Sequence, residues 1–227
     1  MDNPWLALPL IAPYVLDSDR AAIEIFNIHA SEQHRIRTEI VPEPFLGSPD
    51  APVVLLNLNP GFTEHDLQLH KRPQFVESSR KCLRHESQPY PFFLLDPAND
   101  GPGRRWWSRK LRPLIDRFGA RHVAQNVLCV ELFPYHRVRF GGAKLRLPSQ
   151  PYSFHLVESA LDRRALVVFM RSKRLWIAAV PRLEGYGRIC TTRSVQNPTI
   201  SERNCERFGE IVEALNGVAG GTESASH

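Results

Sequence analysis

Two Asn-Pro steps, far apart in the chain, are the residues best suited to chemistry. The first, Asn59-Pro60, ends the apolar run 53–58 and is followed by Gly61 and Phe62. Proline forces the residue before it out of the helical region, and glycine lets a ligand approach the backbone closely. We therefore expect a flat ligand to rest on this turn, in contact with Pro60, Gly61 and Phe62. The alternative is an ordinary turn that caps the next helix.

The second step, Asn197-Pro198, precedes the stretch TISE (199–202), whose Thr and Glu have capping-box spacing. This spacing predicts the start of a helix. The N–H groups at a helix N-terminus face anions, so Thr199, Ser201 and Arg203 are candidates to bind a phosphate.

Alternating apolar runs and helical patterns predict how these residues are positioned. The spacing predicts buried strands at 53–58, 122–132, 165–170 and 186–192, with a half-buried strand at 34–41. Helices are predicted from Asp17 onward and near 71–85, 105–118, 151–163, 171–179 and 202–215. The pattern predicts one α/β domain over 1–216, with a mostly parallel sheet between helices, an N-terminal extension over 1–50 and a disordered tail over 217–227.

In such a sheet, loops at the carboxyl ends of the strands form the ligand cleft. Both Asn-Pro steps and the stretch FPYHR (133–137) follow predicted strands. We therefore expect these three loops to meet at one cleft.

The charge distribution indicates a polyanionic partner. Residues 103–146 contain eleven Lys and Arg against two acidic residues, whereas residues 1–50 contain eight acids against three Lys and Arg. Within the basic block, Trp106 and Trp107 are interleaved with arginines, and an amphipathic core helix is the alternative there. The prolines and Asp2 of the N-terminus fit neither a signal peptide nor a membrane span, so we expect a cytoplasmic protein. We also expect a monomer. The four cysteines form no CxxC pair, which disfavours zinc and iron–sulfur sites.

The stretches LNPG (58–61) and NPTIS (197–201) resemble the first and last motifs of the uracil-DNA glycosylase superfamily. They are most similar to the mismatch-specific (G:U/T) branch, which has Asn at both places. The resemblance implies a three-layer α/β/α sandwich with four main parallel strands. It also implies DNA as the partner and hydrolysis of an N-glycosidic bond without metal or cofactor.

The same resemblance implies roles for individual residues. Asn59 would position the attacking water, because an amide is not a strong general base. Asn197 would stabilise the leaving base, and Ile200 would be the wedge that enters the duplex. The stretch KRPQFV (71–76) is similar to an Arg-Pro-Phe-Val stretch of the iron–sulfur branch, which makes Phe75 the candidate to stack on the flipped base, with Phe92 and Phe93 as alternatives.

The chain departs from the family at Glu131, which stands where the resemblance implies an Asn that reads uracil. An ionised carboxylate only accepts hydrogen bonds, so we expect Glu131 to favour a base offering N–H groups, such as cytosine or adenine derivatives. The alternative is that Glu131 pairs with Arg137. Arg171 and Lys173 follow the run 165–170 and are candidates to contact DNA phosphates.

These features together predict a DNA glycosylase that excises a flipped, damaged or modified base other than plain uracil. A non-catalytic nucleic-acid or nucleotide-binding protein of the same fold is the alternative, since both candidate catalytic groups are amides. A small-molecule hydrolase using Glu64 or Asp66 as base is a third hypothesis.

Overall fold

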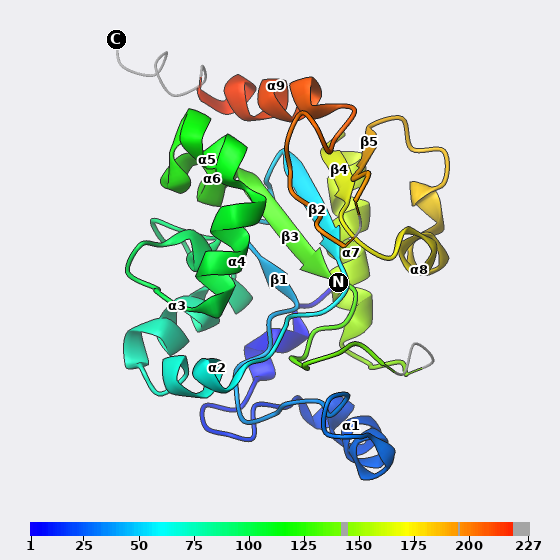
Figure 1. The fold of residues 1–227 in the computed structure, drawn as a ribbon. Helices are drawn as coiled ribbons and strands as arrows, with labels where there is room; N and C mark the ends of the chain where they lie inside the picture. The colour runs from blue at the N-terminus through cyan, green and yellow to red at the C-terminus, as the bar shows by residue number, and fades with distance from the viewer. Residues whose placement is uncertain (142–144, 195, 220–227) are drawn as a thin grey trace.

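The computed structural model describes residues 1–141, 145–194 and 196–219. Five strands form one sheet in the order β1-β3-β2-β4-β5 (Figure 1). They are β1 (Phe45–Leu46), β2 (Val53–Asn57), β3 (Val127–Glu131), β4 (Leu166–Phe169) and β5 (Ile189–Thr191). Strands β2 to β5 pair in parallel, and β1 pairs antiparallel with β3. The prediction of a mostly parallel α/β sheet is confirmed, but the prediction of four strands is wrong, because β1 adds an antiparallel edge strand.

Helices lie on both sides of this sheet, with α3 to α6 on one side and α7 on the other (Figure 1). The α-helices are α1 (Asp17–His29), α2 (Glu64–Leu69), α3 (Pro73–Leu83), α4 (Pro102–Lys110), α5 (Arg112–Phe118), α6 (Ala120–Asn126), α7 (Gln150–Asp162), α8 (Lys173–Ala179) and α9 (Phe208–Ala219). Three short 3₁₀ helices occupy Pro4–Ala7, Phe93–Leu95 and Pro181–Leu183.

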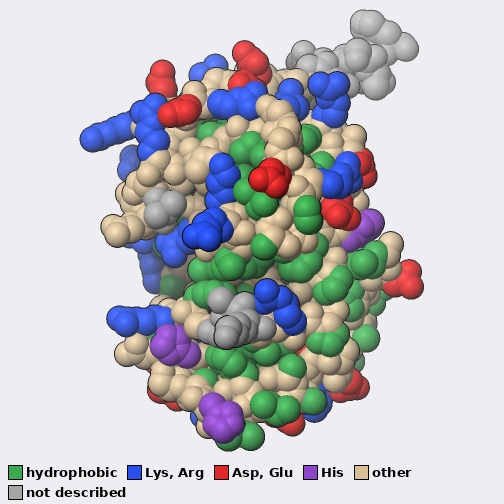
Figure 2. Space-filling model, turned by 90° about the vertical axis from the view of Figure 1, so that its right-hand side faces the viewer, with side chains coloured by type: hydrophobic (Ala, Val, Ile, Leu, Met, Phe, Trp, Pro, Cys, Tyr) green, Lys and Arg blue, Asp and Glu red, His purple; other side chains and the backbone are tan. Residues whose placement is uncertain are grey.

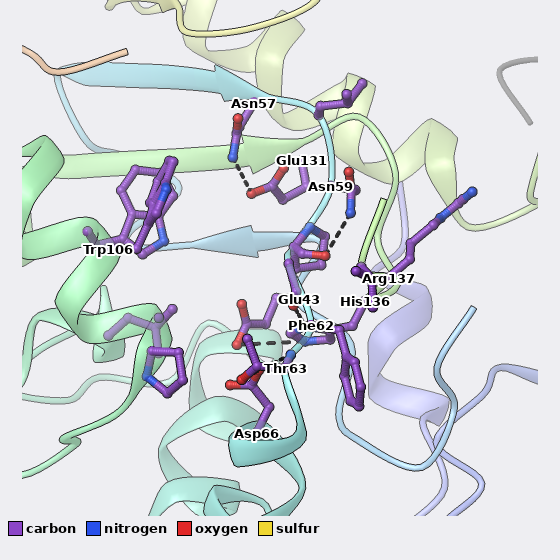
Figure 3. A pocket seen from close by; sticks show the side chains of 18 of the residues that line it. Glu43, Asn57, Asn59, Phe62, Thr63, Asp66, Trp106, Glu131, His136 and Arg137 are labelled. Atoms are coloured by element: carbon purple, nitrogen blue, oxygen red, sulfur yellow. Dashed lines mark hydrogen bonds and ion pairs between the residues drawn. The ribbon is translucent and has the colours of Figure 1, made fainter. Parts of the chain in front are cut away.

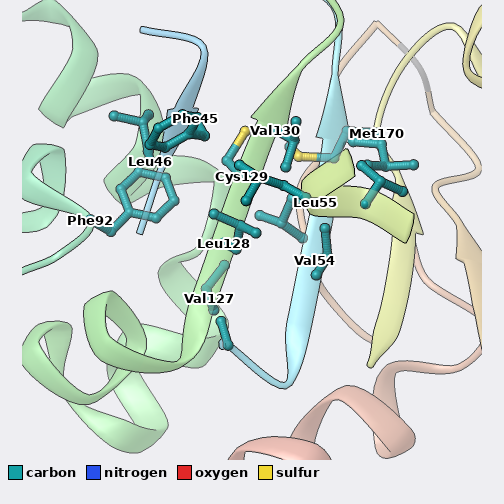
Figure 4. Packing of buried hydrophobic residues seen from close by; sticks show 14 of the residues in the cluster. Phe45, Leu46, Val54, Leu55, Phe92, Val127, Leu128, Cys129, Val130 and Met170 are labelled. Atoms are coloured by element: carbon teal, nitrogen blue, oxygen red, sulfur yellow. The ribbon is translucent and has the colours of Figure 1, made fainter. Parts of the chain in front are cut away.

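The core is centred on β2, β3 and β4, whose residues are all buried. Figure 4 shows side chains of β2 and β3 packed beside one another, with Phe92 and the β1 residues against them. A strand buried on both faces needs apolar residues at successive positions, which is why these segments were recognisable as continuous apolar runs. Fully burying one Val or Leu side chain stabilises a fold by about 1.5–3 kcal/mol.

The predicted strand at 34–41 is wrong. Ile36 and Ile40 are buried as the alternation suggested, but the backbone of this segment does not join a sheet. The Asn27 side chain binds both backbone groups of Ile36, accepting from its N–H (2.8 Å) and donating to its carbonyl (3.0 Å). A side chain thereby takes the hydrogen bonds that a neighbouring strand would otherwise supply.

Three further boundaries differ from the prediction. The run 122–132 begins as helix α6 and becomes strand only at Val127. The helix expected over 105–118 is two helices that meet at Leu111, because Pro113 has no N–H to donate to the carbonyl of Arg109 and its ring clashes with that carbonyl in a continuous helix. Residues 217–219 of the expected tail belong to α9, and 220–227 lie outside the described residues.

Candidate functional site

The loops that follow β2 and β3 lie side by side at the carboxyl edge of the sheet. The N–H of Phe133 donates to the carbonyl of Leu58 (2.9 Å), and the N–H of Arg137 donates to that of Pro60 (3.3 Å). Gly61 and Arg137 form an isolated parallel bridge. The parallel pairing of the two strands thus continues into their loops and brings the Asn59-Pro60-Gly61 turn against FPYHR.

A cavity of about 470 Å³ opens at this edge, within the range of about 300–1,000 Å³ that is usual for ligand sites. Seven of the predicted site residues line it: Asn59, Pro60, Gly61, Phe62, Phe75, Glu131 and Arg171. Figure 3 shows Trp106 across this space from Asn57 and Glu131, with Glu43 and Asp66 near its other end and Asn59, Phe62 and Arg137 on the far side of the turn.

Asn57 and Glu131 are a hydrogen-bonded pair in the lining of this cavity. They are register partners at the ends of β2 and β3, and Asn57 Nδ2 donates to Glu131 Oε1 (2.9 Å; Figure 3). Trp176 Nε1 donates to the Asn57 carbonyl (2.7 Å), which holds the end of β2 in place. Asn57 Oδ1 and Glu131 Oε2 are buried without a partner among the described residues.

Burial raises the pKa of Glu131 to about 8, against the opposing effects of the Asn57 hydrogen bond, the charge of Arg171 and a contact with the Cys129 thiol. The carboxyl group is therefore mostly protonated at neutral pH and carries one donor. This corrects the premise that Glu131 only accepts hydrogen bonds. No ion pair joins Glu131 to Arg137 in the part of the chain that the structure describes, because the Arg137 guanidinium lies 3.7 Å from the centre of the Phe133 ring and points away from the cavity (Figure 3).

Two further carboxyl groups, Glu43 and Asp66, line the cavity. Burial raises the pKa of Glu43 well above its usual value, and the charges of Asp66 and Glu131 raise it further. Glu43 Oε1 lies 3.8 Å from His136 Nε2. Burial lowers the pKa of His136 to about 4, so its ring is neutral and does not supply Glu43 with a cationic partner. Asp66 Oδ2 accepts hydrogen bonds from the backbone and hydroxyl of Thr63, which caps α2.

Aromatic rings form part of the cavity wall. Trp106 is half-buried and faces Glu131 across the cavity (Figure 3), with its ring edge-on to Trp107 at 4.6 Å between centroids. Phe75 is buried and held edge-on by His70 and Phe93 (5.0 and 5.4 Å). Trp106 therefore has more free ring surface for a ligand than Phe75, whereas Phe92 and Phe93 belong to the core.

The Asn59 side chain lies in the cavity lining, and its orientation is set locally. Its Nδ2 donates to the carbonyl of Pro60 (2.7 Å). The amide oxygen is the atom left to accept a hydrogen bond from a water molecule. In Figure 3 the Asn59 amide lies on the side of the turn away from Trp106 and Glu131, and its water-positioning role stays a prediction.

The Asn197 loop does not line the cavity, which corrects the expectation that all three loops meet there. Lys110 Nζ donates to Asn197 Oδ1 and lies 5.2 Å from the centre of the Trp106 ring. The loop thus adjoins the cavity through Lys110 and Trp106, and the amide oxygen of the exposed Asn197 is already bound.

The helix expected after Asn197 begins at Phe208 instead. Residues 204 and 205 are drawn toward the end of β5: Arg193 N–H donates to the Asn204 carbonyl (2.9 Å), and Thr192 forms a bridge with Cys205. This tertiary pairing overrides the capping-box signal. Thr199 and Ser201 therefore lie in a turned segment, where no helix N-terminus presents N–H groups to a phosphate.

Other predicted positions are also outside the cavity lining. Ile200 is fully buried, and its N–H donates to the Lys110 carbonyl (2.8 Å), so the expectation that it is an exposed wedge is wrong. Lys173 packs over the Phe169 ring (5.6 Å), and Arg203 is exposed on the Asn197 loop. Of the five predicted phosphate contacts, Arg171 lines the cavity and Lys173, Thr199, Ser201 and Arg203 do not.

Sequence reasoning missed Asn57, Glu43 and His136. Asn57 carried a signal, since it is a polar residue at the end of an apolar strand that is buried on both faces. Glu43 and His136 carried none, because their contact joins residues far apart in the chain. Trp106 carried a signal, because it lies among the arginines of the basic block, but its spacing is equally typical of an amphipathic core helix.

The described residues contain no group of three or more His, Cys, Asp and Glu side chains that could hold a metal ion. Among these residues, no helix has the length and apolar character needed to cross a membrane. Comparisons with protein-family models, with curated proteins and with solved structures found no match to this chain.

Proposed function

We propose that this protein is a DNA glycosylase, which hydrolyses the N-glycosidic bond of a flipped, damaged or modified base. One observation carries the proposal. The Asn59-Pro60-Gly61 turn and the Asn57–Glu131 pair border the same cavity, whose wall includes Trp106. A planar base needs both features, since its ring stacks on an aromatic side chain and its edge is read by hydrogen bonds.

The fold agrees with this proposal. It is of the α/β class, with strands β2 to β5 in parallel between helices, and β1 adds an antiparallel edge strand. The cavity lies at the carboxyl ends of β2 and β3, where open α/β sheets bind their ligands.

The surface charge also agrees with a DNA partner. Arg171 lines the cavity, and Lys110 lies beside Trp106 at its edge. Figure 2 shows Lys and Arg side chains gathered at mid-height along the left-hand edge of this face, where few acidic side chains interrupt them. Such a surface attracts the phosphate backbone in a salt-dependent manner.

In the proposed reaction, Asn59 accepts a hydrogen bond from the water that attacks C1′. Trp106 and Phe75 contact the flipped base, and the Asn57–Glu131 pair reads its edge. The Asn197 amide is engaged by Lys110, so it takes no direct part. Extruding the nucleotide costs a few kcal/mol and favours bases that are already weakly paired.

A non-catalytic binding protein is the second candidate, because Asn197 is turned to Lys110 and the Asn59 amide is bonded to Pro60. Labelled single- and double-stranded oligonucleotides with modified bases separate the two. A glycosylase leaves alkali-labile abasic sites, and Asn59→Ala abolishes them while DNA binding persists. Binding without cleavage of any substrate in the panel contradicts the enzymatic proposal.

A further inference from the structure

Two buried oxygen atoms in the cavity lining, one on each residue of the hydrogen-bonded Asn57–Glu131 pair, have no hydrogen-bond partner among the described residues. They are Asn57 Oδ1 and Glu131 Oε2, on side chains whose exposed fractions are 6% and 2%. The hydrogen bond from Asn57 Nδ2 to Glu131 Oε1 (2.9 Å) fixes the orientation of both groups. A buried polar atom without a partner costs about 1–3 kcal/mol, so a ligand that supplies the missing partners is favoured.

The two atoms differ in what they offer. An amide oxygen only accepts hydrogen bonds, whereas a protonated carboxyl group also donates one. Burial holds the Glu131 carboxyl in its protonated form at neutral pH, as described above. The pair therefore presents an acceptor beside an acidic donor.

We propose that Glu131 is the general acid of the reaction: it protonates a ring nitrogen of an amino-substituted base whose exocyclic amine donates to Asn57. The substrate class is thus a cytosine- or adenine-type base, with a ring nitrogen acceptor next to an amino group. This inference rests on the proposed glycosylase function and adds the leaving-group chemistry to it.

The rest of the cavity favours an amino base over uracil. An amino group has two N–H donors, so it can donate to Asp66 as well as to Asn57. A carbonyl oxygen and the N3–H of uracil also fit a donor beside an acceptor, but uracil has a single N–H on that edge. In addition, a carboxylic acid transfers a proton usefully to a basic ring nitrogen, whereas a uracil carbonyl is too weakly basic to receive it.

The step is balanced in atoms and electrons. The Glu131 proton moves to the ring nitrogen, the C1′–N bond breaks, and its electron pair returns to the base, which leaves as a neutral molecule. The oxygen of water forms the new bond to C1′. The water then loses a proton to solvent, from which the Glu131 carboxylate recovers its own. General acids of this kind contribute typically 10²–10⁴-fold to a rate.

The groups that act electrostatically on Glu131 set the pH range of this chemistry. Arg171, the Asn57 amide and the Cys129 thiol favour the ionised form, and burial outweighs them. Glu43 is also close enough for its charge to interact with that of Glu131. Activity that requires protonated Glu131 should fall as pH rises through about 8.

The test combines binding with cleavage. Free cytosine and free uracil are titrated into the protein by calorimetry at several pH values. Single-turnover cleavage is measured on oligonucleotides that carry modified cytosines, modified adenines or uracil. The central variant is Glu131→Gln, which retains an acceptor for Asn57 and a donor for the ring nitrogen but has no transferable proton. Circular dichroism establishes that the variant is folded.

We expect wild type to bind cytosine more tightly than uracil. Glu131→Gln should bind cytosine within about threefold of the wild-type affinity. Its rate of cleavage of amino bases should be at least about 100-fold lower than that of wild type. The cytosine affinity of wild type should decline above about pH 8, and that of the variant should not. Preferred excision of uracil, or equal cleavage by Glu131→Gln, overturns the acid role and leaves the glycosylase proposal intact. Selective cytosine binding with no cleavage of any oligonucleotide overturns both.

Discussion

Replacing Glu131 with Gln should change how the stability of the protein depends on pH. The folded-state pKa of Glu131 is about 8, against a usual value of 4.5. The folded protein thus holds this proton more tightly than the unfolded chain. The resulting stabilisation is complete below about pH 4.5 and is lost as pH rises through about 8. The amide that Glu131→Gln introduces does not titrate, so the variant lacks this loss.

The linkage relation converts the shift into a free energy. One pKa unit corresponds to about 1.4 kcal/mol, and wild type should lose roughly 3 kcal/mol relative to Glu131→Gln between about pH 5 and about pH 8. Urea denaturation at a series of pH values measures this difference, and Glu213→Gln, on the exposed face of α9, is the matched control. Repeating the pair on a Glu43→Gln background removes the coupled titration of Glu43. A difference that varies by less than about 0.5 kcal/mol over this range would refute the reasoning.

Three other predictions concern the cavity wall, the Asn197 loop and the thiols. Trp106→Ala should weaken binding of the free base by about 1–3 kcal/mol, measured by calorimetry, because stacking requires an aromatic face. Trp106→Phe should retain most of the wild-type affinity. Equal affinities for wild type and Trp106→Ala would show that Trp106 is not part of the site. Ile200→Ala should lower the free energy of unfolding by about 2–5 kcal/mol in urea denaturation, as expected for a fully buried side chain, whereas a DNA wedge would instead lose cleavage at unchanged stability. Burial raises the pKa of the Cys82 thiol to about 12. Iodoacetamide at about pH 8 should therefore modify Cys82 only after denaturant is added. Mass spectrometry of labelled peptides measures this, and modification of Cys82 in the folded protein would contradict the prediction.

The central sheet was predictable because its strands are local apolar runs. Val53–Asn57 and Leu166–Phe169 are buried on both faces, and that environment requires successive apolar residues that are visible in the sequence. The two-residue strand β1 was not predictable, since so short an element has no periodicity. Its pairing with β3 depends on where the chain returns in three dimensions.

Local signals failed where a distant partner competed for the same backbone groups. The alternation at 34–41 predicts a strand, but Asn27 takes the backbone hydrogen bonds of Ile36. The capping-box spacing after Asn197 predicts a helix, but residues 204 and 205 pair with the end of β5. Neither contact follows from hydrophobic periodicity or capping-box spacing, because each depends on how the chain turns back in three dimensions.

The sequence by itself determined the α/β character of the chain and the positions of the two Asn-Pro steps, because strand burial and the conformational effects of proline and glycine act over a few residues. Tertiary structure alone decided which of these positions share a cavity. The parallel pairing of β2 with β3 sets Asn57 against Glu131, and burial of that pair, rather than its residue types, shifts the Glu131 pKa toward neutrality. Burial and pairing depend on the whole fold, and so does the chemistry that we propose for this site.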